Sequence, residues 1–173
     1  MFSQVAKIND HLYLSAAAAV TPDKVRSNHI NLVINCTIEM PNVRIPKVET
    51  MKVSVDDTPS SRINLYFDRC ADRIKTNRDG GGRTLVHCMA GVSRSSSICI
   101  AYLMKHEGLS LKDAYALVKA RRPIIRPNPG FFRQLIDYEK QLFGRSTVSM
   151  VPSPIGAIPD VYKEDARNML AVW

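Results

Sequence analysis

The sequence predicts an α/β domain with a mostly parallel central sheet of about five strands, flanked by helices on both faces. In the first half of the chain, short apolar and β-branched segments alternate with segments of helical period. In the second half, helical patterns follow one another without a strand between them. A short, largely apolar segment at residues 83–87 separates the halves, as expected for a strand buried on both faces of a sheet.

The first half supplies three further strands and two helices. Segments rich in apolar and β-branched residues predict strands at residues 11–15, 31–38 and 48–55. Thr21 followed by Pro22 indicates a short helix, because threonine caps helix N-termini and proline fits the first helical position. Between residues 61 and 82, apolar residues recur at helical spacing until a run of glycines ends the helix.

The second half supplies three helices with clear end signals. The apolar periodicity predicts them at residues 94–106, 111–120 and 130–143. Gly108 stops the first, and Ser110 with Asp113 forms a capping box at the start of the second. Asn128 and Pro129 cap and begin the third. Residues beyond 144 show no clear period until close to the C-terminus.

Length and charge are those of a globular domain with an anionic partner. The chain has 173 residues and a net charge of +8, which suits phosphate, nucleic acid or an acidic membrane surface. No apolar run is long enough to cross a bilayer, and the N-terminus lacks the pattern of a signal peptide. We therefore expect an intracellular protein, cytoplasmic, nuclear or both, with no membrane insertion.

The four cysteines fall into two groups. Neither a C-x-x-C pair nor a downstream histidine spacing indicates zinc. Cys36, Cys70 and Cys99 lie in apolar segments and are predicted to be buried thiols that pack as small hydrophobic side chains. Cys88 alone lies where a strand meets a loop. We expect no metal ion and no organic cofactor.

The stretch HCMAGVSRS, which contains Cys88, predicts an anion-binding loop. The chain must curl between Cys88 and Arg94, and Gly91 permits the positive φ that such a curl needs. Arg94 begins the next helix and offers a planar fork that suits two phosphate oxygens. The phosphate would be surrounded by the backbone N–H groups of Met89, Ala90, Gly91, Val92 and Ser93.

Cys88 would lie at the bottom of this loop as a nucleophile. A helix N-terminus and a nearby arginine favour the thiolate, which could attack a bound phosphorus and form a cysteinyl-phosphate. The Ser95 hydroxyl would donate a hydrogen bond to the sulfur and improve it as a leaving group. His87 is expected to hold the backbone near Cys88 rather than act as a base. The competing interpretation, a plain strand–turn–helix with an incidental cysteine, is disfavoured by five residue types at fixed offsets.

The loop matches the H-C-x-x-G-x-x-R-[ST] signature, and the chain thereby resembles the cysteine-based protein tyrosine phosphatases. The longer stretches VHCMAGVSRSSSICIAYLM and KARRPIIRPNPGFFRQLIDYEKQLFG narrow the resemblance to the small atypical dual-specificity phosphatases. The likeness extends to INDHLYLS and MKVSVDDTPSSRINLYFD and covers nearly the whole chain. It implies a phosphatase-like fold, with a catalytic domain at residues 1–144 and a C-terminal extension at 145–173 that packs on it.

Cleavage of a phosphate ester also needs a proton for the leaving oxygen. The turn SVDDTPSS offers Asp56 and Asp57, and the pattern alone does not separate them, since either could cap the following helix. The resemblance implies Asp57, which lies 31 positions before Cys88. It also places Asn128 as a helix cap that steadies the nearby loop. Three arginines could orient acidic substrate or simply be solvated: Arg121, Arg122 and Arg126.

The implied activity is hydrolysis of phosphotyrosine and of phosphoserine or phosphothreonine in proteins. Residues 37–50 hold no long insertion that would build a high rim, so we expect a shallow pocket. The implied partners are phosphorylated proteins, with mitogen-activated protein kinases suggested by the resemblance alone.

Several alternatives stay open from the residues themselves. They are an RNA 5′-phosphatase or another non-protein phosphatase, a non-catalytic phosphate-binding module, and a sulfurtransferase. The loop carries no lysine for a lipid headgroup, and no aromatic and basic platform for nucleic acid is evident.

Overall fold

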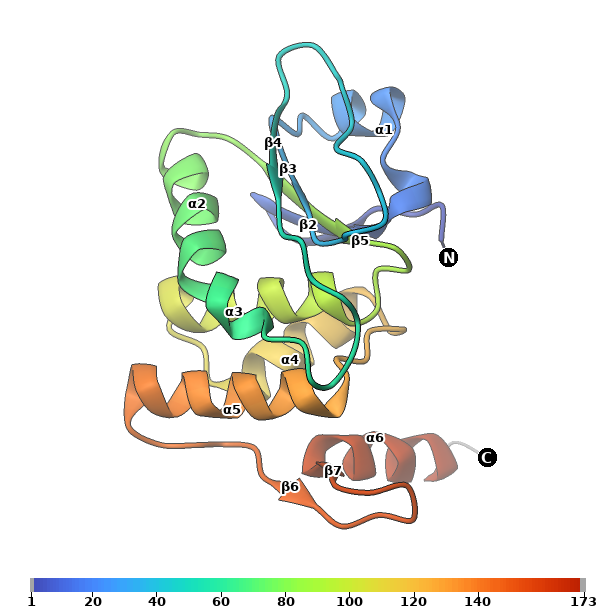
Figure 1. The fold of residues 1–173 in the computed structure, drawn as a ribbon, viewed down its shortest axis with the longest axis vertical. Coiled ribbons are helices and arrows are strands. Elements are labelled where there is room, and N and C mark those ends of the chain that lie inside the picture. The colour runs from blue at the N-terminus through green and yellow to red at the C-terminus, as the bar shows by residue number, and fades with distance from the viewer. Residues whose placement is uncertain (1, 172–173) are drawn as a thin grey trace.

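A five-stranded sheet forms the centre of the computed structural model, which describes residues 2–171. Its strands are β1 (Ala6–Asn9), β2 (Leu12–Ala16), β3 (Leu32–Asn35), β4 (Glu49–Lys52) and β5 (Thr84–Cys88). Their order in space is β1-β2-β5-β3-β4, and only the β1–β2 pair is antiparallel (Figure 1). The predicted fold class is confirmed. The sequence does not predict β1, because only Ile8 of its four residues is buried and no alternation results.

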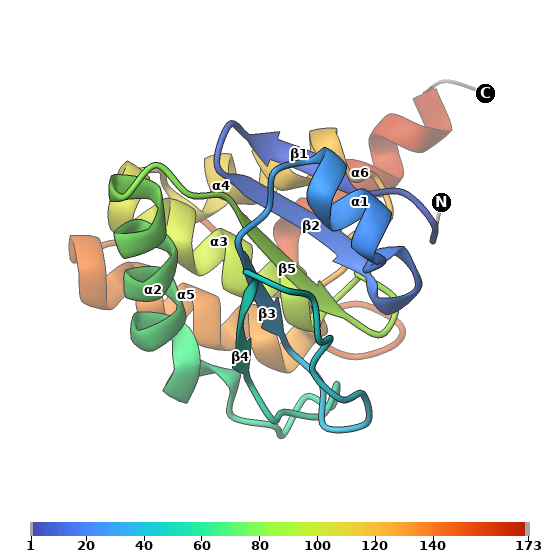
Figure 2. The same ribbon diagram turned by 90° about the horizontal axis from the view of Figure 1, so that it is seen from above.

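Helices cover both faces of this sheet. These helices are α1 (Pro22–Ser27), α2 (Phe67–Asp79), α3 (Arg94–Glu107), α4 (Leu111–Arg121) and α5 (Pro129–Phe143). A further helix, α6 (Asp160–Ala171), lies away from the sheet (Figure 1). Seen from above, α1 lies on one face of the sheet, whereas α2, α3, α4 and α5 lie on the other (Figure 2). Short 3₁₀ turns at Ala17–Ala19 and Ile63–Tyr66 complete the connections.

The strands divide the core into two clusters. Alternate residues of a strand point to opposite faces of the sheet, so Leu14 and Val86 join the large cluster under α2 to α5. Tyr13 and Leu85 join the small cluster that contains Val25 of α1. Helix α3 is buried over most of its length and forms the centre of the large cluster. The carboxyl end of β5 is therefore held from both sides where the next loop begins.

The predicted cap residues of the helices are confirmed. Thr21, Ser110 and Asn128 each accept a hydrogen bond from a backbone N–H of the first turn that follows. The C-caps Gly108 and Gly144 adopt left-handed conformations at the ends of α3 and α5.

Three predicted elements are shorter than expected. The strand predicted at residues 48–55 is observed as β4 at Glu49–Lys52, and beyond it the Val55 N–H donates back to the Val53 carbonyl, which turns the chain. Strand β3 ends at Asn35 rather than near residue 38, because the Asn35 side chain accepts hydrogen bonds from the backbone N–H and hydroxyl of Thr37 and turns the chain. The helix expected from residue 61 begins as a 3₁₀ turn, and α2 itself starts at Phe67.

The C-terminal segment packs under α4 and α5. It contains a short antiparallel pair, β6 (Met150–Val151) with β7 (Ile158–Pro159), followed by α6 (Figure 1). The Tyr115 hydroxyl on α4 donates a hydrogen bond to Asp165 on α6 over 2.6 Å. The division of the chain at residue 144 stays a prediction. None of the helices described in residues 2–171 combines the length and apolar character needed to span a bilayer.

Candidate active site

The loop between β5 and α3 is fastened by its carbonyl groups. The Met89 carbonyl accepts from the Ala17 N–H at 3.1 Å, and the Val92 carbonyl accepts from the Arg126 N–H at 2.8 Å. The described hydrogen bonds engage none of the amide N–H groups of residues 89–93. With the carbonyls held from outside, these N–H groups are available to an anion at the centre of the loop.

Arg122 holds the same loop from behind. Its guanidinium donates to the Gly91 carbonyl at 2.8 Å and to the Ala90 carbonyl at 3.0 Å. The side chain is only 4% exposed, so Arg122 is neither solvated nor directed at substrate, and neither interpretation offered by the sequence holds for it. Arg121 and Arg126, in contrast, are exposed.

Gly91 has the backbone geometry that the curl requires. Its φ is +68°, and a Cβ at this position would lie 2.7 Å from the carbonyl carbon and oxygen of Ser15. Both the positive φ and the close approach of β2 therefore call for glycine.

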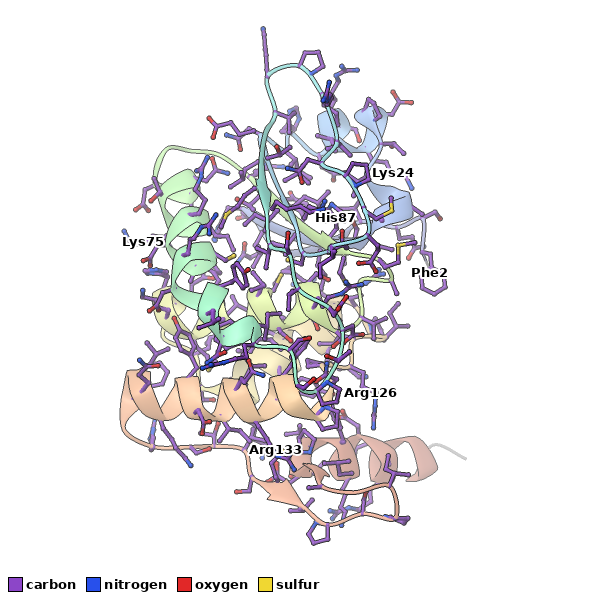
Figure 3. All side chains as sticks on the ribbon, viewed as in Figure 1. Phe2, Lys24, Lys75, His87, Arg126 and Arg133 are labelled. Atoms are coloured by element: carbon purple, nitrogen blue, oxygen red, sulfur yellow. The ribbon has the colours of Figure 1, made fainter. Side chains whose placement is uncertain are left out.

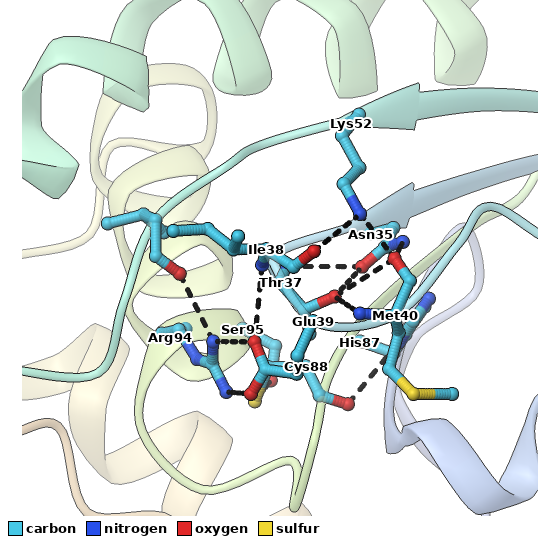
Figure 4. Close-up of polar contacts among 11 residues, drawn as sticks. Asn35, Thr37, Ile38, Glu39, Met40, Lys52, His87, Cys88, Arg94 and Ser95 are labelled. Carbon is cyan, nitrogen blue, oxygen red and sulfur yellow. Dashed lines mark hydrogen bonds and ion pairs between the residues drawn. The ribbon is translucent and has the colours of Figure 1, made fainter.

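Cys88 and Ser95 meet at the base of the loop. The Cys88 Sγ lies 3.0 Å from the Ser95 Oγ, and both residues are buried (Figure 4). A hydroxyl at this distance can donate a hydrogen bond to the sulfur. The other three cysteines are fully buried, and burial raises the pKa of Cys70 to about 12. These three thiols are buried in the core, as the sequence predicts.

His87 lies inside the fold at the end of β5 (Figure 3). Its Nδ1 is 3.3 Å from the Cys88 carbonyl oxygen, and its Nε2 has no hydrogen-bond partner among the described residues. Burial lowers the pKa of His87 below its usual value, so the neutral ring is favoured. A neutral histidine that contacts the backbone of Cys88 is consistent with a structural role and not with that of a general base.

Arg94 is clamped by a residue that sequence reasoning missed. Its Nη1 and Nη2 donate to the two carboxylate oxygens of Glu39 at 2.8 and 2.9 Å, and Nη1 also donates to the Val55 carbonyl at 3.1 Å (Figure 4). The hydrogen bond to Arg94 lowers the pKa of Glu39 to about 2.

These contacts use three of the five N–H donors of the guanidinium. Nε–H and the second Nη2 hydrogen remain, and these two form the side-on fork that matches two phosphate oxygens. Glu39 therefore leaves the fork open while it fixes the plane of the group.

The turn that carries Glu39 is held in place by polar contacts around Asn35. The Asn35 side chain donates to the Met40 carbonyl at 2.9 Å and accepts from the Thr37 hydroxyl at 2.7 Å. The Lys52 ammonium also donates to the Met40 carbonyl (Figure 4). One signal in the sequence could have found Glu39: it follows a buried strand that ends at the same edge of the sheet as β5.

Asp57 and Asn128 are brought together from distant parts of the chain. The Asn128 side-chain amide donates to the Asp57 carboxylate at 2.9 Å, while its oxygen caps α5. The hydrogen bond to Glu39 is the main cause that raises the pKa of Arg94, and the Asp57 charge adds a smaller contribution in the same direction. No described contact links Asp56 to Asn128 or Arg94.

The site offers no arrangement for a metal ion. Within residues 2–171, no group of three or more histidine, cysteine, aspartate or glutamate side chains is placed to hold one. The groups that could bind a ligand are the loop amides and the open fork of Arg94, and both suit an oxyanion.

A mostly parallel sheet whose central strand ends in a cysteine, followed by an amide-lined loop and an arginine, is the arrangement of a cysteine-based phosphatase. The family model "Dual specificity phosphatase, catalytic domain" matches residues 12–141. The chain belongs to the dual specificity phosphatase family, and it is an enzyme that hydrolyses phosphate esters in proteins.

Its relatives are small phosphatases of the same kind. The chain is 49% identical over 170 residues to human dual specificity protein phosphatase 14, covering 98% of this chain and 86% of that protein. It is 48% identical over 169 residues to human dual specificity protein phosphatase 18, covering 97% and 90%. The crystal structure of human DUSP28 superposes with a TM-score of 0.77 at 34% identity, covering 80% of this chain and 94% of that one.

Proposed function

We propose that Cys88 is the nucleophile of a two-step phosphate transfer that accepts phosphotyrosine as well as phosphothreonine and phosphoserine. In the first step the Cys88 thiolate attacks phosphorus, the ester bond breaks, and the leaving oxygen takes a proton from Asp57. In the second step Asp57 removes a proton from water, which attacks the cysteinyl-phosphate and releases phosphate and the thiolate. Each proton that Asp57 gives in the first step is recovered in the second.

The other residues are assigned by what they touch. The amides of residues 89–93 and the free fork of Arg94 bind the three non-bridging oxygens, whose charge grows during transfer. Ser95, 3.0 Å from the Cys88 sulfur, stabilises the thiolate when it leaves. Asn128 orients the Asp57 carboxylate through a hydrogen bond, and the His87 ring holds the Cys88 carbonyl in place.

A single observation carries this proposal. The Cys88 sulfur lies within hydrogen-bond distance of Ser95 at the base of a loop that Arg94 closes, with Asp57 held by Asn128 beside it. A module that only reads phosphate has no need of an acid held beside the phosphate loop. We also propose mitogen-activated protein kinases as one class of substrate, supported by the resemblance alone. We propose the cytoplasm or nucleus as the location, as the sequence predicts.

The test is turnover of aryl phosphates by the wild type and by Cys88→Ser, Asp57→Asn and Asp56→Asn. We expect Cys88→Ser to be inactive. Asp57→Asn should slow substrates with poor leaving groups about a hundred-fold and good leaving groups much less, because only the former need the proton. Asp56→Asn is the matched control and should behave as wild type. An active Cys88→Ser enzyme would overturn the proposal.

A further inference from the structure

The three residues 126–128 connect two parts of the active site. The Arg126 N–H donates to the Val92 carbonyl of the phosphate loop at 2.8 Å. The Asn128 N–H donates to the Ser93 hydroxyl at 2.9 Å, and the Asn128 side chain donates to Asp57 at 2.9 Å. A shift of this segment would therefore move the loop and the acid together.

The C-terminal segment contacts residues 126–128 through Tyr162 of α6. The Tyr162 hydroxyl donates a hydrogen bond to the Pro127 carbonyl. The Arg126 guanidinium lies over the Tyr162 ring, 4.1 Å from its centre. Arg126 precedes the start of α5, close to α6 (Figure 3). Tyr162 is 4% exposed and also packs edge-on against Phe132 of α5 at 5.4 Å.

The two hydrogen bonds around Pro127 act on one rigid unit. The Pro127 carbonyl and the Asn128 N–H belong to the same planar peptide group and point in opposite directions. Tyr162 holds this plane from one side, and Ser93 holds it from the other. Without the tyrosine hydroxyl, the plane can rotate, and the direction in which Asn128 presents its amide to Asp57 changes with it.

We propose that Tyr162, far from the chemistry in sequence, is a positioning residue for the acid step. It fixes the peptide plane between Pro127 and Asn128 and thereby sets the position of Asp57. This inference rests on the proposed function, because it assumes that Asp57 protonates the leaving oxygen.

The chain contains a matched control on the same interface. Tyr115 is 3% exposed, packs against both Phe132 and Tyr162, and donates its hydroxyl to Asp165 of α6. Its hydroxyl donates no described hydrogen bond to residues 126–128, although the charge of Arg126 acts on it. Loss of either hydroxyl removes one hydrogen bond between the tail and the rest of the molecule, but only the Tyr162 hydroxyl donates to the segment that holds the acid.

The experiment compares Tyr162→Phe, Tyr115→Phe and the wild type on aryl phosphates with good and poor leaving groups. We expect Tyr162→Phe to lower kcat about five-fold to ten-fold on poor leaving groups and less than about two-fold on good ones, as for loss of an interaction used only in the acid step. Tyr115→Phe should leave kcat unchanged on both kinds of substrate. The unfolding midpoints of the two phenylalanine variants should fall by similar amounts, because each loses one hydrogen bond of the tail. In an Asp57→Asn background, Tyr162→Phe should have no further effect.

The outcomes separate the two proposals. Equal behaviour of the two phenylalanine variants, or a Tyr162→Phe effect that persists without Asp57, would overturn the role of Tyr162 and leave the phosphatase assignment intact. An inactive wild type would overturn both. Should Tyr162→Phe fail to fold, Arg126→Met removes the cation from the ring and keeps the buried tyrosine. Arg126→Met should lower kcat on poor leaving groups about two-fold to three-fold and leave good leaving groups unchanged. Wild-type kinetics in this variant would contradict the positioning role of Tyr162.

Discussion

At the residue scale, Arg94 depends on a carboxylate outside its own loop. Glu39 accepts two of its hydrogen bonds and holds the guanidinium plane in one orientation. An amide at this position keeps the shape of the side chain but removes its charge and one acceptor. We expect Glu39→Gln to lower kcat/KM for an aryl phosphate by about three-fold to ten-fold, since a charge-assisted hydrogen bond is lost. Glu49→Gln, which affects an exposed carboxylate paired with Arg73, should not change turnover.

The same pair makes stability depend on pH in a defined direction. Glu39 has a pKa of about 2 in the fold against an ordinary value of 4.5. A lowered carboxyl pKa stabilises the folded state only while the group is ionised, so the contribution is complete above 4.5 and is lost as the pH falls toward 2. Urea midpoints of wild type and Glu39→Gln should therefore differ by a constant amount above pH 4.5 and converge below it. A difference that grows on acidification would contradict the assignment.

Gly91 offers a test of the phosphate loop that separates backbone conformation from contact. Gly91 and Gly108 have nearly the same φ, +68° and +69°, but a Cβ would meet Ser15 and Arg122 at Gly91 and nothing within 4 Å at Gly108. Gly108→Ala should cost about 1–2 kcal/mol of unfolding free energy, from the left-handed conformation alone. Gly91→Ala should cost clearly more and abolish turnover. Equal losses would show that the close packing around Gly91 can relax.

At the element scale, one residue joins the start of α5 to the acid. The Asn128 oxygen accepts from the Phe131 N–H, and its amide nitrogen donates to Asp57. Asn128→Asp keeps the cap oxygen but replaces the donor with a second carboxylate oxygen beside Asp57. We expect nearly wild-type stability, because aspartate caps helices as well as asparagine, together with slower turnover of poor leaving groups.

The companion variant removes both functions of this side chain. Asn128→Ala should show the same kinetic defect and also lose about 1 kcal/mol of unfolding free energy. Ser110→Ala deletes a cap of the same kind on α4, away from the site, and should lose stability without slowing turnover. If Asn128→Asp had wild-type kinetics, Asn128 would cap α5 without positioning Asp57.

At the scale of the whole molecule, the start of α5 lies in close backbone contact with the turn that carries Asp57 and Pro59. A Cβ on Gly130 would lie 1.9 Å from the Pro59 carbonyl oxygen. Alanine in a helix is favoured over glycine by about 1 kcal/mol, so only this contact can make Gly130→Ala destabilising. We expect a lower urea midpoint and slower turnover of poor leaving groups. A variant more stable than wild type with unchanged kinetics would show that the turn is free to move away.

The sequence by itself determined what is local in this protein. The curl of residues 88–94, the cap residues and the apolar periods of the helices lie within a few positions of one another, and local backbone and side-chain preferences specify them directly. The resemblance then added the choice of Asp57 over Asp56, which no local pattern could make.

Only the tertiary structure decided how distant groups combine. Glu39 meets Arg94 across 55 positions, Asn128 meets Asp57 across 71, and Tyr162 meets Pro127 across 35. Such pairs leave no periodic or turn signal, because they form only when separate strands and helices pack into one core and bring their ends to the same edge of the sheet. The phosphate loop is therefore encoded by one continuous stretch of the chain. The residues that position this loop and Asp57 come together only through tertiary packing.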